Sequence, residues 1–93
     1  MGQLEKSWTY YLKILDAAPT GHDYLNAGHV AWGKGDRKEA IRLYRLAIKS
    51  GFEDFPHFLR SFRADKAYLL AAGIDPADIP LMLDYLEYTL ERI

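Results

Sequence analysis

The sequence predicts an all-α fold in which antiparallel helix hairpins stack on one another and a last helix caps the stack. Apolar residues recur at helical spacing in several segments, and glycines and prolines separate these segments. No segment shows the alternation of apolar and polar residues that is typical of a half-buried strand. The chain also repeats part of its own pattern after 33 residues, which is typical of proteins built from stacked helical units.

The first two expected helices span residues 4–17 and 23–32. The first carries an apolar stripe and ends before Pro19 and Gly21; its stripe is Leu4, Trp8, Tyr11, Leu12 and Leu15. The second has an unusually small stripe, which is Tyr24, Ala27, Gly28 and Ala31, and the turn 33–35 closes it. A third helix is expected over 37–49, with Asp36 as its N-cap, Glu39 completing a capping box and Gly51 as its stop.

The remainder of the chain is expected to form two more helical segments. The first begins at Phe55, has a kink or a new start near Asp65, and stops at Gly73; its apolar residues are Phe58, Leu59, Phe62, Tyr68, Leu69 and Leu70. Residues 74–79 form a turn. The last helix starts around Pro80 and packs on the preceding helices through an apolar stripe made of Met82, Tyr85, Leu86, Thr89, Leu90 and Ile93.

Length and composition predict one small domain over residues 1–93 and argue against nucleic-acid binding, membrane binding and thiolate chemistry. Apolar residues make up 49% and charged residues 27%, so the chain has enough apolar surface to fold. A net charge of −1 supplies no field for nucleic acid or an anionic bilayer, and the absence of cysteine excludes disulfides and thiolate sites. No apolar run is long enough for a signal peptide or a membrane span, so we expect a cytoplasmic location. Whether the chain is a whole protein or an excised piece is left open.

The internal repeat carries a family resemblance. A shift of 33 lays Ser7, Tyr11, Ile14 and Leu15 over Ala40, Tyr44, Ala47 and Ile48. The spacing Tyr24-x2-Ala27-Gly28-x2-Ala31-x8-Ala40-x3-Tyr44-x2-Ala47 resembles the tetratricopeptide repeat (TPR), although Ala27 and Ala31 replace bulkier residues and Phe52 replaces the closing proline. The resemblance implies a short right-handed TPR-like solenoid. Residues 22–51 would be one full repeat, residues 4–19 the second helix of a partial repeat, and residues 55–93 a degenerate repeat and cap, similar to the C-terminal end of bacterial multi-repeat proteins.

The same resemblance implies a protein-protein interaction module that binds a peptide or protein without catalysis, cofactor or metal. Because the small stripe of the second helix faces the interior, the expected partner contacts are the residues beside it, which are Leu25, Asn26, His29 and Trp32. Alternatively, Trp32 packs on the fourth helix near Phe58 or Phe62. Related chaperone-binding modules hold the terminal carboxylate of a ligand with lysines and asparagines on this face. Only Asn26 matches that pattern in this sequence. The side of residues 4–15 that carries Trp8, Leu12 and Leu15 lacks a partner helix, which predicts weak self-association as a homodimer.

Two other functions are weighed against peptide binding. The chain could serve as the structural cap of a longer solenoid, as its degenerate third unit and acidic last helix indicate. Residues 67–93 are acidic, with one Lys or Arg against five Asp and Glu, whereas residues 34–66 are basic, with nine Lys and Arg against five Asp and Glu. A remote alternative is nucleotide binding through Gly28 to Gly35, a near match to a phosphate-binding loop. That loop requires a preceding strand and a Ser or Thr where Gly35 stands. His22 and His29 lie two helical turns apart with no shared carboxylate, which disfavours a metal site.

Overall fold

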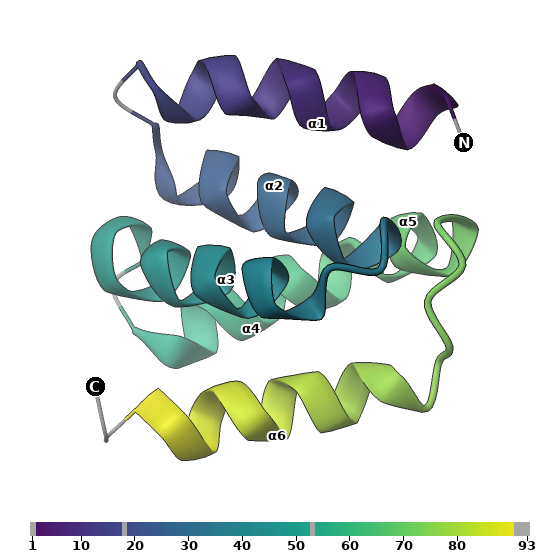
Figure 1. The fold of residues 1–93 in the computed structure, drawn as a ribbon. Coiled ribbons are helices and arrows are strands. Elements are labelled where there is room, and N and C mark those ends of the chain that lie inside the picture. Colours follow the sequence, from purple (N-terminus) through teal and green to yellow (C-terminus); the bar gives the residue numbers. More distant parts are fainter. Residues whose placement is uncertain (1, 18, 53, 91–93) are drawn as a thin grey trace.

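A computed structural model describes residues 2–17, 19–52 and 54–90, and the regular structure in these ranges is helical, which confirms the all-α fold. The helices are α1 Gly2–Leu15, α2 Gly21–Gly33, α3 Arg37–Gly51, α4 Phe55–Ala64, α5 Lys66–Ala71 and α6 Asp78–Leu90. They stack in layers, with α1 at one end, α2 next to it, α3 and α4 in the middle and α6 at the other end (Figure 1). No helix among the described residues is long and apolar enough to cross a bilayer.

The helix starts follow capping chemistry, with one difference from the expectation. Asp36 caps α3 by accepting a hydrogen bond from the Glu39 amide at 3.2 Å, as predicted. The Glu39 carboxylate, however, accepts two hydrogen bonds from the Arg42 guanidinium, at 2.6 and 2.8 Å, so the predicted return bond to Asp36 is wrong. A charged donor one turn along competes successfully for that carboxylate. The reciprocal box forms instead at α2, between Thr20 and Asp23.

The α2–α3 hairpin is held together by small residues, as the repeat pattern predicts. A Cβ atom added to Gly28 would lie 2.5 Å from Cε1 of Tyr44, so only glycine allows the two helices to approach this closely. Ala27, Ala40 and Ala47 are fully buried along the same contact. The turn after α2 contains Gly35 in the left-handed region, with φ of 91°. These small side chains therefore let α2 and α3 pack closely against each other.

Two aromatic side chains of α4, Phe58 and Phe62, extend the core of the hairpin. Their ring centroids lie 6.0 and 5.3 Å from the Tyr44 ring. The helical path breaks at Asp65, as predicted, and α5 follows until Gly73, whose φ is 95°. The break places Asp65 within hydrogen-bond distance of His29 on α2.

The terminal helices differ in part from their predicted packing. On α6, Met82 and Leu86 are buried as expected, but Tyr85 is half-exposed, with its ring 5.7 Å below the Arg45 guanidinium. The predicted contacts of Leu90 and Ile93 lie outside the side chains that the structure describes. On α1, Trp8 and Leu15 pack partly against the core, so the expectation that they belong to an unpartnered side is wrong. The exposed apolar residues of α1 are Tyr10 and Leu12, at 61% and 47%.

Candidate functional site

The structure buries three of the four predicted contact residues. Leu25, His29 and Trp32 are buried on α2, and Asn26 is partly exposed. Three of the four are therefore core side chains and not exposed ones; the Phe62 ring of α4, for example, lies 5.1 Å from the His29 ring. The Trp32 ring lies 6.3 Å from the Phe62 ring, which confirms the alternative that Trp32 packs on the fourth helix. The role of the four residues in partner binding stays a prediction.

A pocket of about 260 Å³ opens beside Asn26 and His29, and we call it the tyrosine groove. Three parts of the chain that are far apart in sequence form its walls: α1, α2, and the segment where α4 ends and α5 begins. Its lining residues are Ser7, Tyr11, Asn26, His29, Asp65 and Tyr68. Two of the four predicted residues thus share a pocket, whereas Leu25 and Trp32 do not line it.

His29 connects the floor of the groove to the core. Its Nδ1 lies 2.7 Å from the Tyr44 hydroxyl, and its Nε2 lies 3.0 Å from Oδ2 of Asp65. An ionised carboxylate can only accept, so we assign the proton to Nε2, which donates to Asp65 while Nδ1 accepts from the Tyr44 hydroxyl. Burial lowers the pKa of His29, and Asp65 opposes part of this effect. The imidazole is therefore neutral at pH 7 and fixes the Asp65 carboxylate in place.

Asp65 presents the remaining part of its carboxylate to the groove. It occupies the break between α4 and α5, and its side chain is 36% exposed although one oxygen contacts the buried His29. Tyr11 and Tyr68 stand nearby on α1 and α5. Burial raises the pKa of both phenols, and the neighbouring Tyr68, Tyr10, Asp23 and Asp65 raise that of Tyr11 further. At neutral pH the groove combines a carboxylate with protonated phenols, and its lining contains no lysine or arginine.

The Asp65–His29–Tyr44 chain has the order of a catalytic relay, but its terminal hydroxyl has no access to a substrate. Tyr44 is 0% exposed and lies between α2 and α4. Activation of a nucleophile requires that the reacting atom reach the substrate. The chain of hydrogen bonds therefore joins three parts of the fold and holds Asp65, which is a structural task.

The glycine-rich segment from Gly28 to Gly35 lacks the geometry of a phosphate-binding loop. Its first six residues are part of helix α2, and the remainder is the turn that follows it. A phosphate-binding loop follows a strand and precedes a helix whose free amides face the phosphates. Here the Lys34 amide donates within the end of α2, and the Lys34 ammonium lies 5.2 Å from the centre of the Trp8 ring.

Sequence reasoning missed the part of the groove that comes from outside α2. Tyr11 was expected to be a core residue, and Asp65 a residue at a kink. One signal was available, because the 33-residue shift lays Asp65 over Trp32, a predicted contact position. Nothing in the sequence placed Ser7 or Tyr68 beside it, because their proximity depends on how α1 and α5 pack on α2.

Comparison with known proteins identifies the central hairpin. Residues 24–50, which include most of α2 and α3, match the tetratricopeptide repeat family. No curated protein and no solved structure matches the chain.

Proposed function

Because residues 24–50 form a tetratricopeptide repeat, a motif that is generally a protein-interaction module, we propose that this chain binds a peptide segment of a partner protein in the tyrosine groove. The observation that supports it is the convergence of three chain segments on one pocket with an accessible carboxylate. The chain performs no chemistry on the peptide. Its fold holds the groove open.

The groove suits a basic side chain of that peptide. The Asp65 carboxylate supplies an acceptor for a lysine ammonium or an arginine guanidinium, and the Tyr11 and Tyr68 rings supply aromatic surface for the same cation. Since Asp65 is fixed by His29, little side-chain entropy is lost when the ion pair forms. Asn26, which lines the groove from α2, can bond to the peptide backbone through its amide.

The open shape of the groove favours a peptide over a small metabolite. Sites for small molecules usually cover most of the surface of the ligand. The tyrosine groove measures about 260 Å³ and is open on one side. It has room for one or two side chains, while the rest of an extended peptide would lie on the neighbouring surface.

A selection from a random peptide display library tests the proposal. The peptides that bind the parent protein should be enriched in lysine or arginine at one fixed position. Asp65→Asn keeps an oxygen that accepts from His29 but removes the charge, so it should weaken the selected peptides by 10-fold or more. Asp16→Asn, an exposed acid outside the groove, is the matched control and should leave binding unchanged. A selection without basic residues, or equal binding by Asp65→Asn, would refute the proposal.

A second role, as the cap of a longer solenoid, is favoured by the packing of α6. Met82 and Leu86 of this helix cover the side of α3 that would otherwise face solvent. The two roles are compatible, because α6 contributes no residue to the lining of the tyrosine groove and lies at the opposite end of the stack from α1, which does (Figure 1). Met82→Asp tests the packing of α6 on which this role depends: it places a charge in the core and should lower the unfolding temperature strongly without replacing a groove residue.

A further inference from the structure

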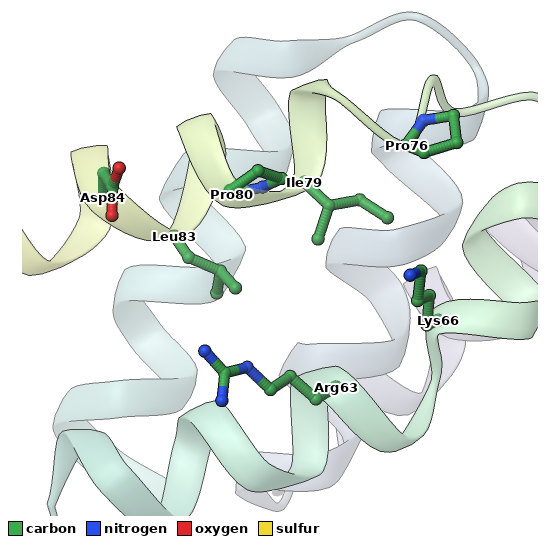
Figure 2. Close-up of a pocket in the computed structure, with 7 residues that line it drawn as sticks. All are labelled: Arg63, Lys66, Pro76, Ile79, Pro80, Leu83 and Asp84. Atoms are coloured by element: carbon green, nitrogen blue, oxygen red, sulfur yellow. The ribbon is translucent and has the colours of Figure 1, made fainter.

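A second pocket lies on another side of the α4–α5 break, and we call it the end cleft (Figure 2). It measures about 330 Å³. The end of α4 and the start of α5 form one wall, and the start of α6 with the turn before it forms the other. The lining residues are Arg63, Lys66, Pro76, Ile79, Pro80, Leu83 and Asp84.

The two cations of the end cleft, Arg63 and Lys66, have no partner among the residues that the structure describes. Figure 2 shows the Arg63 guanidinium extending toward Leu83, with Lys66 farther along the same wall. In the residues that the structure describes, neither side chain forms an ion pair or a hydrogen bond, and Asp84 at the edge of the cleft pairs with neither. The adjacent residues Asp65 and Lys66 thus give opposite charges to two different pockets.

The opposite wall of the end cleft is apolar and rigid. Ile79 and Leu83 are nearly buried, and their remaining exposed surface faces the cleft beside Pro76 and Pro80. Both prolines have a fixed φ, and Pro80 lies in the first turn of α6. A ligand that fits this cleft needs an anionic group for the basic wall and an aliphatic group for the apolar wall.

We propose that the end cleft binds a segment of a partner protein that carries an acidic side chain next to a large aliphatic side chain. The glutamate or aspartate pairs with Arg63 and Lys66, and the aliphatic group packs on Ile79 and Leu83. Arginine is suited to the carboxylate because its planar guanidinium can donate two parallel hydrogen bonds. This second site has the opposite charge preference to that of the tyrosine groove and does not depend on it.

The test is a second random-peptide selection, performed on the protein with Asp65→Asn so that the tyrosine groove is weakened. Enriched peptides should contain Asp or Glu next to Leu, Ile or Met. The double variant Arg63→Gln with Lys66→Gln should weaken the selected peptides by 10-fold or more, because it removes both charges and keeps polar side chains of similar length. Arg60→Gln, an exposed cation of α4 that does not line the cleft, is the control and should bind as the parent does.

Three results would overturn the inference: a selection without the acidic and aliphatic pair, unchanged binding by the double variant, or equal loss in the control. The Arg63→Gln, Lys66→Gln and Arg60→Gln changes should leave the melting temperature of the Asp65→Asn protein nearly unchanged, since these three residues are exposed. A failure here leaves the basic-peptide selection on the parent protein unaffected, so the two proposals are separable.

Discussion

The hydrogen bond between Tyr44 and His29 joins α3 to the floor of the tyrosine groove, and a double-mutant cycle measures its free energy. Tyr44→Phe removes the buried hydroxyl and leaves Nδ1 of His29 without its donor. His29→Leu keeps most of the apolar contacts with Phe62 and leaves the Tyr44 hydroxyl without its acceptor. Each single change should lower the free energy of unfolding by about 1–3 kcal/mol, because one buried polar atom loses its partner.

The double variant has neither polar atom, so its loss should be smaller than the two single losses together. We expect a coupling free energy of about 1–3 kcal/mol, measured by urea unfolding of the four proteins at pH 7.5. Asp65 does not change this expectation, since its partly exposed carboxylate can bond to water after His29 is lost. Additivity within about 0.5 kcal/mol would show that the two side chains do not interact, which would refute the account of the groove floor.

Three further predictions concern acid stability, the cap and α1. Burial lowers the pKa of His29 below its ordinary value of 6.5, so on acidification the unfolded chain binds a proton at His29 at a higher pH than the folded chain does. The contribution of His29 to the free energy of unfolding should therefore be fully present above pH 6.5. Below that pH it should fall, by at most about 1.4 kcal/mol per pH unit. Urea unfolding at pH 7.5 and 5.0 should show a smaller fall in the variant with both His29→Leu and Tyr44→Phe, and equal falls would contradict the assignment. Leu86 is 1% exposed, so Leu86→Ala should lower the free energy of unfolding by about 2–5 kcal/mol. Leu81 lies on the same helix but is 58% exposed, so Leu81→Ala should change that free energy by no more than about 0.5 kcal/mol. Similar losses at both positions would argue against the placement of α6. Tyr10→Ser with Leu12→Ser should abolish weak self-association in sedimentation experiments while Leu81→Ser preserves it, and a parent chain that is strictly monomeric at high micromolar concentration would refute the predicted α1 contact.

The helices and the central hairpin could be predicted because their determinants are local. Small residues at the spacing of Gly28, Ala40 and Ala47 permit a close helix contact wherever they occur, and Gly35 and Gly73 mark turns that need a positive φ. The break near Asp65 could also be predicted, because aspartate is a favoured residue at the start of a new helix. These features need no knowledge of the remaining chain.

The site could be predicted only in part, since it depends on contacts between segments far apart in sequence. Helical periodicity placed Asn26 and His29 on one side of α2 but could not show that α4 covers Trp32. Nor could it pair His29 with Asp65, 36 residues later. Capping preferences alone did not show that the Glu39 carboxylate would pair with Arg42 and not with the Asp36 amide, because Arg42 and Asp36 both lie within one helical turn of Glu39.

The most direct test of the central claim is an NMR titration of the ¹⁵N-labelled protein with a lysine-containing peptide from the first selection. The account predicts that the largest shift changes occur at Asn26, Asp65 and Tyr68, and that they vanish when the peptide lysine is replaced by methionine. Changes centred on Ile79 and Leu83 of the end cleft, or on the exposed face of α6, would place the peptide elsewhere and contradict the claim that the tyrosine groove is its binding site.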